Sequence, residues 1–375
     1  MSKSVGFGSF VDHFSALEDP RQAWKVLYPL DELLLLALCA TLSGTDDFVE
    51  MSEWGAMQLE FLRRFRPYAH GVPSHDTLND VFNALDGEQF QGCFIAWAAG
   101  LRDDAGREDE PEVIAIDGKT SRRTGDARKA RSPLHLVSAW AARQRLVLGQ
   151  QATAEKSNEI TAIPQLLEKL ALQGALVTID AMGCQRDIAA KISAAGGDYL
   201  LALKGNQPAL LDDVRFFFDD DHERDLLECF ETVDGDHGRI ETRRHRITHD
   251  VGWLQRDHDW PALAAIAMVE ATREIDGEVS RSRRFYITSA DLDAKRFAAA
   301  VRAHWGVENR LHWVMDVVFH DDLCRLRSGA APQNMATVRH MALNLIKTAN
   351  DKSSIKVRRK KAAWSTQYLE NIIRQ

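Results

Sequence analysis

The stretch Val113-Ile114-Ala115-Ile116-Asp117-Gly118-Lys119-Thr120 decides the fold expected for this chain. Its four apolar, partly β-branched residues are typical of a short buried strand, and Gly118 is expected to end that strand directly after an aspartate. A carboxylate at the end of a core strand is held rigidly at the edge of a sheet, which suits metal binding better than a mobile loop does. Asp117 is therefore the first candidate metal ligand.

Two further acidic residues stand in comparable settings. Leu176-Val177-Thr178-Ile179-Asp180 is another apolar strand that ends in aspartate, and Glu308 follows His304-Trp305-Gly306-Val307 in a predicted helix. A small set of hard oxygen ligands leaves coordination positions for phosphate oxygens and suits Mg²⁺ or Mn²⁺. We expect Asp117, Asp180 and Glu308 to hold two such ions, and the chemistry implied is two-metal phosphodiester hydrolysis or transfer.

Length and composition indicate an ordinary soluble protein. The 375 residues are enough for two or three domains, and 45% hydrophobic with 27% charged residues is usual for that class. The apolar run from Leu33 to Leu42 is about half as long as a membrane helix. No signal segment opens the chain, so we expect a cytoplasmic protein without a membrane partner. The five cysteines form no CxxC pair, which argues against a zinc cluster or a disulfide framework.

Basic residues gather locally although the net charge is −8. Six basic residues and one acidic residue lie between Lys119 and Arg131, directly after the first aspartate. Nine basic and two acidic residues lie between Arg339 and Gln375. Such runs either form solvated surface or contact nucleic acid, and a global charge sum does not separate the two. The position of the first run beside a candidate metal site favours nucleic acid there.

The order of predicted elements indicates the fold class. Residues 1–105 are predicted to form a helical N-terminal domain, which either docks DNA or a second subunit or is purely structural; the charged segment 102–112 marks its boundary. Three strands, a helix, a strand, a helix and a fifth strand follow, which is the order of a ribonuclease-H-like α/β core with a mixed five-stranded sheet. In that core the first and fourth strands are neighbours, which would bring Asp117 and Asp180 together.

The rest of the chain departs from this order before it returns to helix. Residues 207–293 are predicted to form a β-rich insertion within a catalytic domain spanning 112–350. Alternate arginines on its strands, such as Arg244 and Arg246, either grip a DNA backbone or lie on a solvated edge. Residues 351–375 are predicted to form a basic C-terminal tail.

One predicted helix near residues 294–318 carries His304, Glu308 and His312 on the same face, since they are spaced four residues apart. A zinc site is an alternative for this pattern, but the spacing is not HExxH and the sequence indicates no third ligand. The histidines, with Trp305 and Trp313, are instead expected to pack the helix and to contact phosphates or unpaired bases.

Several blocks in a fixed order connect the chain to a known family. They include Val72-Pro73-Ser74-His75-Asp76-Thr77, Ile116-Asp117-Gly118-Lys119-Thr120, Lys156-Ser157-Asn158-Glu159-Ile160, Thr178-Ile179-Asp180-Ala181-Met182-Gly183-Cys184-Gln185, Lys204-Gly205-Asn206-Gln207 and His304-Trp305-Gly306-Val307-Glu308-Asn309. With these blocks the chain resembles bacterial insertion-sequence transposases of the H-repeat-associated type, which belong to the DDE transposases. The resemblance implies a ribonuclease-H-like catalytic domain with Asp117, Asp180 and Glu308 as its metal-binding triad.

The resemblance also implies an activity and a set of partners. The expected activity is metal-dependent cleavage of double-stranded DNA at terminal inverted repeats and transfer of the ends into target DNA, with a homodimer as the active complex. Related transposases carry Tyr, Arg and Lys around the last acid, where this chain has Val301, His304 and Met315. The residues expected to contact DNA are Lys119, Arg122, Arg123, Lys204, Asn206, Gln207, Arg302, His304, Trp305, Arg310 and His312.

Two alternatives stay open at this point. A nuclease that cuts without joining would use the same site with a different nucleophile. An inactive, transposase-derived DNA-binding protein would keep the DNA contacts without turnover. Asn158 and Glu159 are expected to start a helix rather than to act in catalysis, with Ser157 or Asn158 as its cap.

Overall fold

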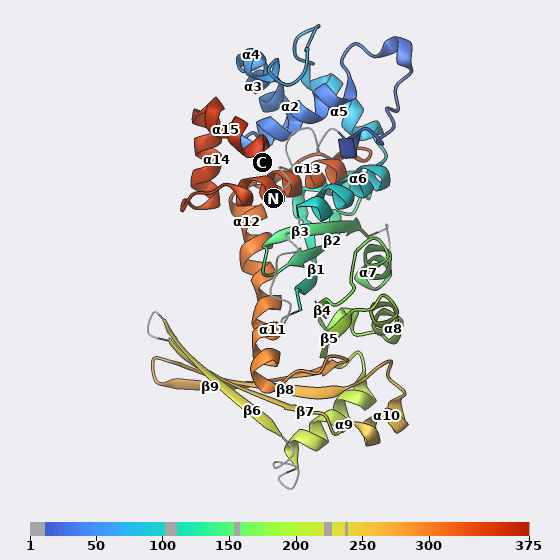
Figure 1. The fold of residues 1–375 in the computed structure, drawn as a ribbon, viewed down its shortest axis with the longest axis vertical. Helices are drawn as coiled ribbons and strands as arrows, with labels where there is room; N and C mark the ends of the chain where they lie inside the picture. The colour runs from blue at the N-terminus through green and yellow to red at the C-terminus, as the bar shows by residue number, and fades with distance from the viewer. Residues whose placement is uncertain (1–11, 102–110, 154–157, 221–226, 237–238, 375) are drawn as a thin grey trace.

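A single mixed sheet runs through the middle of the molecule (Figure 1). The computed structural model describes residues 12–101, 111–153, 158–220, 227–236 and 239–374. In the described residues the strand order across the sheet is β3-β2-β1-β4-β5-β9-β8-β7-β6. The strands are β1 (Val113–Ser121), β2 (Leu134–Ala141), β3 (Leu146–Ala152), β4 (Leu176–Ile179), β5 (Asp198–Leu203), β6 (Glu228–Asp236), β7 (Arg239–Thr248), β8 (Ala265–Ile275) and β9 (Glu278–Thr288).

The neighbouring positions of β1 and β4 confirm the predicted strand adjacency. The two strands pair in parallel from Val113 opposite Leu176 to Ile116 opposite Ile179. Asp117 and Asp180 directly follow the last residues of this parallel pairing, so they lie at the same level of the sheet. The prediction that Gly118 ends the strand is wrong, because β1 continues to Ser121 in antiparallel pairing with β2. β1 extends beyond the end of β4 because its other neighbour, β2, is longer and continues to pair with it.

The sheet has nine strands in the described residues rather than the five expected. The predicted β-rich insertion is not a separate layer, because β9 pairs antiparallel with β5 between Leu203 opposite Phe285 and Leu200 opposite Thr288. The insertion also contains two helices, α9 (Pro208–Asp219) and α10 (Gly252–His258), that pack on the sheet. Alternation of residues within a strand indicates a buried face but does not identify its partner strand.

Helices cover the two faces of the sheet differently. Ile114 and Ile116 face a core shared with α7 (Glu159–Leu167) and α8 (Arg186–Ala194), whereas Ala115 faces the opposite core. Successive side chains on a strand point to opposite faces, so Asp117 shares the side of Ala115. That side is crossed by α11 (Ala294–Val307), which continues through a π-helical turn (Glu308–His312) into α12 (Trp313–Val317) (Figure 1).

A helical body formed by both ends of the described chain lies at one end of the molecule, away from β6–β9 (Figure 1). Its helix α2 is apolar around its whole circumference and is therefore buried. The Asn344 side chain joins this body to the sheet edge, since it donates to the Val147 carbonyl at 2.8 Å and accepts from the Val147 N–H at 2.9 Å. The helices are α2 (Leu30–Leu42), α3 (Phe48–Met57), α4 (Leu59–Leu62), α5 (His75–Ala84), α6 (Gly87–Gly100), α13 (Ala331–Thr348), α14 (Ile355–Trp364) and α15 (Thr366–Ile373).

Short 3₁₀ turns connect several of these elements. No helix among the described residues is long and apolar enough to cross a membrane. The predicted domain boundary at 102–112 lies mostly outside the described residues, as does Ser157. The 3₁₀ turns are Ala23–Lys25, Arg122–Thr124, Ala127–Lys129, Ala181–Gly183 and Asp321–Leu323.

The predicted basic tail is folded. Its residues form α14 and α15, and Arg359 at the centre of the basic run is buried. The Arg359 guanidinium donates to the carbonyls of Thr41, at 2.9 and 3.2 Å, and of Val318. It also lies 4.4 Å from the centre of the Phe319 ring. Within the helical body this arginine therefore connects α14 to α2 and to the residue that follows α12, and it is not available to DNA.

We expect Arg359→Ala to lower the free energy of unfolding by about 2–4 kcal/mol, because it leaves two buried carbonyls without their charged donor. Lys360→Ala is the matched control: the neighbouring side chain is exposed, and its removal should change stability by less than about 0.5 kcal/mol. Urea unfolding monitored by circular dichroism measures both. Equal effects of the two substitutions would contradict the structural role of Arg359.

Candidate metal centre

Two aspartates meet where the parallel pair of β1 and β4 ends. Asp180 caps the 3₁₀ turn Ala181–Gly183, and its Oδ1 accepts from the backbone N–H groups of Met182 at 3.0 Å and Gly183 at 3.4 Å. Those hydrogen bonds fix the Asp180 carboxylate at the strand end. Asp117 is held by β1 itself and lines the same cavity as Asp180.

Glu308 and His312 approach Asp117 from the π-helical turn. His312 Nδ1 lies 3.2 Å from Glu308 Oε2 and 3.4 Å from Asp117 Oδ2. One donor atom from each of these three residues lies within 4.8 Å of the other two. π-helical turns are rare and are frequent at functional sites. The sequence pattern predicted Glu308 as a ligand, whereas it offered His312 as a ligand only in the alternative of a zinc site and otherwise as a contact to DNA.

The electrostatics of this cluster favour a cation. The pKa of Asp117 is raised to about 7, chiefly by burial and also by the negative charges of Asp180, Glu159 and Glu308, while the hydrogen bond from the Gly118 N–H lowers it. Among the described residues, no lysine or arginine is paired with Asp117, Asp180 or Glu308. Carboxylates whose charge no lysine or arginine neutralises, with an imidazole beside them, form a set of donor atoms that suits a divalent ion.

Lys119, the nearest basic residue along β1, is occupied by other carboxylates. Its ammonium lies 2.6 Å from Asp316, 3.4 Å from Asp321 and 3.3 Å from Asp322, and only 13% of its side chain is exposed. Asp321 in turn pairs with the buried Arg339 at 3.0 Å. The structure therefore does not favour the expected contact of Lys119 with phosphate, because the charge of Lys119 is already compensated.

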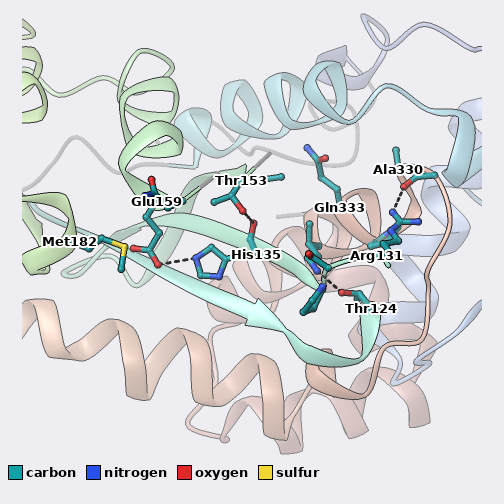
Figure 2. A pocket seen from close by; sticks show the side chains of 15 residues that line it. Thr124, Arg131, His135, Thr153, Glu159, Met182, Ala330 and Gln333 are labelled. Carbon is teal, nitrogen blue, oxygen red and sulfur yellow. Dashed lines mark hydrogen bonds and ion pairs between the residues drawn. The ribbon is translucent and has the colours of Figure 1, made fainter. Parts of the chain in front are cut away.

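A fourth carboxylate, Glu159, lies against the opposite side of β1. Glu159 starts α7, which Asn158 caps as predicted, and its Oε1 is 2.8 Å from His135 Nε2 on β2. The other ring nitrogen, His135 Nδ1, is 2.7 Å from Thr120 Oγ1. Figure 2 shows Glu159 and His135 pointing toward each other in a pocket of about 520 Å³. Sequence reasoning treated Glu159 as a helix-start residue alone and missed this contact.

Some of the predicted DNA contacts surround a second cavity. A cavity of about 340 Å³ beside Asp117 and Asp180 is lined by Lys204, His304 and Trp305 among others. Trp305 is 47% exposed, and the Arg284 guanidinium lies 4.7 Å from its ring centre. His304 Nδ1 lies 3.0 Å from Thr178 Oγ1, and burial lowers the pKa of His304.

The remaining predicted contacts lie elsewhere or are used within the protein. Asn206 donates to the Ala181 carbonyl at 2.6 Å, and Gln207 donates to the Cys184 carbonyl at 3.0 Å, so both hold the loop after Asp180. These hydrogen bonds hold the loop that follows Asp180, and the predicted contacts of both amides with DNA stay predictions. Arg122 and Arg123 are exposed on a 3₁₀ turn, Arg302 pairs with Asp234 at 2.6 Å, and Arg310 lines a different cavity.

The matches of sequence to family models and to curated proteins agree on one family. A family model described as "Transposase DDE domain" matches residues 108–345, and one described as "DDE_Tnp_1-associated" matches residues 11–98. The chain is 39% identical to "H repeat-associated putative transposase YhhI" of Escherichia coli strain K12 over 97% of both chains. "Inactive transposase YbfQ" of that strain is 38% identical over 19% of this chain and 84% of its own length. A structure of the piggyBac transposase synaptic complex with hairpin DNA has a TM-score of 0.45 and 10% identity, over 97% of this chain and 80% of that one.

The raised pKa of Asp117 predicts how stability depends on pH without metal. A carboxyl whose pKa is raised on folding stabilises the fold at low pH, and that contribution is lost as the pH rises through about 7. In EDTA, Asp117→Asn should therefore gain about 1–3 kcal/mol of unfolding free energy relative to the unmodified protein between pH 5 and pH 8. Chemical unfolding at both pH values measures this gain. The exposed Asp257→Asn control should show none, and a pH-independent difference for Asp117→Asn would contradict the prediction.

The contact of Glu159 with β1 predicts that a side chain at position 118 lowers stability. A Cβ at Gly118 would lie 2.1 Å from Glu159 Oε1 and 2.7 Å from His135 Nε2. Gly118→Ala should therefore cost about 1–3 kcal/mol of stability. Gly252→Ala is the control, because its added Cβ meets nothing within 4 Å. Thermal unfolding of the two variants tests this, and equal stabilities would show that Glu159 moves aside freely.

Proposed function

This chain belongs to the family of DDE transposases, and we propose that it cleaves DNA at the ends of an insertion sequence and joins those ends to target DNA. The family match covers most of the chain and supports the class of protein. The observation that carries the proposed chemistry is the meeting of Asp117 and Asp180 at the end of the β1–β4 ladder, with Glu308 near Asp117 on the π-helical turn that follows α11. Asp117 and Asp180 line one cavity, and Asp117 and Glu308 belong to one cluster of donor atoms. No lysine or arginine among the described residues pairs with any of the three carboxylates.

The proposed roles of the residues follow from their positions. Asp117 shares a cavity with Asp180 and a donor cluster with Glu308, so it is suited to contact both of two divalent ions. Asp180 is fixed by its capping hydrogen bonds, and Glu308 by the helix that crosses the sheet. Bound Mg²⁺ or Mn²⁺ would lower the pKa of the attacking water or 3′-hydroxyl and stabilise the leaving oxygen. Residues 117, 180 and 308 therefore form the proposed catalytic triad.

DNA binding is proposed to use exposed groups around the triad. Lys204 and Trp305 line the cavity beside the carboxylates, where an ammonium can contact a phosphate and an exposed indole can stack on a base. Arg122 and Arg123 add two exposed basic side chains on the 3₁₀ turn that follows β1. Contacts of this kind supply affinity that depends on salt concentration. Terminal inverted repeats and target DNA are the proposed substrates, and a dimer would hold the two ends together.

We expect the Glu308→Ala variant to lose cleavage at the termini of the element while it keeps most of its DNA affinity. The triad carboxylate acts on the reacting phosphate, whereas distributed phosphate contacts supply binding. Cleavage should fall by at least ~100-fold, beyond the loss typical of residues that only support metal ligands. Mapping of cut strands on terminal DNA, with Mg²⁺ or with EDTA, measures turnover, and a mobility-shift assay measures binding.

A control variant and a joining assay distinguish a transposase from a nuclease and from an inactive DNA-binding protein. Asp257→Asn, on the exposed surface of α10, should cleave normally. A supercoiled target added to the reaction shows whether cut ends are joined, and cutting without joining would indicate a nuclease. Binding without cleavage by the unmodified protein would overturn the proposal in favour of an inactive DNA-binding protein.

A further inference from the structure

His312 occupies a position among the acids that a DNA contact does not explain. Its side chain is only 6% exposed, so a phosphate or base cannot reach it readily. The widened π-helical turn directs Leu311 and His312 inward, while Glu308, Asn309 and Arg310 remain exposed. The imidazole therefore belongs to the interior of the site and not to its DNA-facing surface.

The separations around His312 Nδ1 resemble those between ligands of one ion. Neighbouring donors of an octahedral ion lie about 1.4 times the metal–ligand distance apart, which is about 3.0 Å for a bond of 2.1 Å. The two separations from Nδ1, 3.2 Å to Glu308 and 3.4 Å to Asp117, are close to that value. Charge-assisted hydrogen bonds are usually shorter, near 2.7–2.9 Å.

Binding of an ion at Nδ1 requires the ring proton of a neutral His312 to stand on Nε2. A neutral imidazole carries one N–H and one lone pair. His312 also lines a cavity of about 10 Å³ together with Ser121, Ser138 and Asp321, and its Nε2 is buried without a hydrogen-bond partner among the described residues. Nδ1 lies within hydrogen-bond distance of Glu308 Oε2, and a cation bound between the carboxylates would take the place of that hydrogen bond while the ring proton stands on Nε2. Lys119 is not that cation, because three other carboxylates bind its ammonium.

We propose that His312 Nδ1 is a direct ligand of the ion held by Asp117 and Glu308, and that this nitrogen makes the site select Mn²⁺ over Mg²⁺. The inference rests on the metal requirement of the proposed function. Mg²⁺ prefers oxygen ligands, whereas imidazole is a ligand of transition-metal ions. A site of two carboxylates and one imidazole therefore prefers Mn²⁺ over Mg²⁺ more strongly than a site of three carboxylates does.

The test uses the full-length protein and Mn²⁺ as the probe. Electron paramagnetic resonance of free Mn²⁺ measures the dissociation constant, competition with Mg²⁺ measures selectivity, and electron spin echo modulation detects a directly bound imidazole nitrogen. We expect Mn²⁺ to bind at least ~10-fold more tightly than Mg²⁺ and to show that nitrogen coupling. In His312→Gln the coupling should disappear and Mn²⁺ affinity should fall about tenfold, with a smaller change for Mg²⁺.

Two controls keep the test decisive. His304→Gln, one helical turn before Glu308 and bonded to Thr178, should retain the nitrogen coupling. Protein labelled with ¹⁵N-histidine should change the modulation pattern without any substitution, so the test stands even if His312→Gln does not fold.

The possible failures are distinguishable. Mn²⁺ that binds, is lost in Asp117→Asn, and shows no histidine nitrogen would overturn the role of His312 and leave the proposed function intact. Absence of Mn²⁺ binding to the unmodified protein at millimolar concentration would overturn both.

Discussion

The parallel pairing of β1 with β4 is the constraint on which the site depends. Parallel strands with matched register deliver equivalent positions to the same level of a sheet, and here the last paired residues are Ile116 and Ile179. The aspartates that follow are adjacent although 63 residues separate them in the chain. Because both strands are buried on both faces, their register cannot slip without exposing apolar side chains. The hydrophobic core therefore sets the separation of the two carboxylates.

The opposite faces of β1 have different tasks. Asp117 faces α11 and the π-helical turn, where Glu308 and His312 lie, whereas Gly118 faces α7 and makes room for Glu159. Behind the acids, Lys119, Asp321 and Arg339 form a buried ionic network that compensates its own charges. The arrangement keeps lysine and arginine side chains away from Asp117, so no such cation competes with a divalent ion for the carboxylates.

The long sheet connects two parts of the molecule that differ in character. At one end, helices from both ends of the described chain share a single apolar core, and the buried Arg359 bonds α14 to carbonyls of that body. At the other end, β6–β9 extend the sheet through the pairing of β5 with β9. Many arginines of these strands are paired with acids, such as Arg244 with Glu231 and Arg283 with Glu270. That pairing favours a structural role over a continuous DNA-binding face.

The sequence alone determined the elements whose signals are local, and the tertiary structure decided what those elements meet. Apolar runs that end in aspartate, the cap at Asn158 and the strand order were sufficient to place Asp117 beside Asp180, because they depend on near neighbours and on a common topology. The nine-stranded sheet, the partners of Lys119 and the burial of Arg359 depend on residues up to 318 positions away. The placement of His312 depends on a π-helical turn that a spacing of four residues does not reveal. Such contacts form only when the core packs, since packing determines which charges are buried and which carboxylates find a partner.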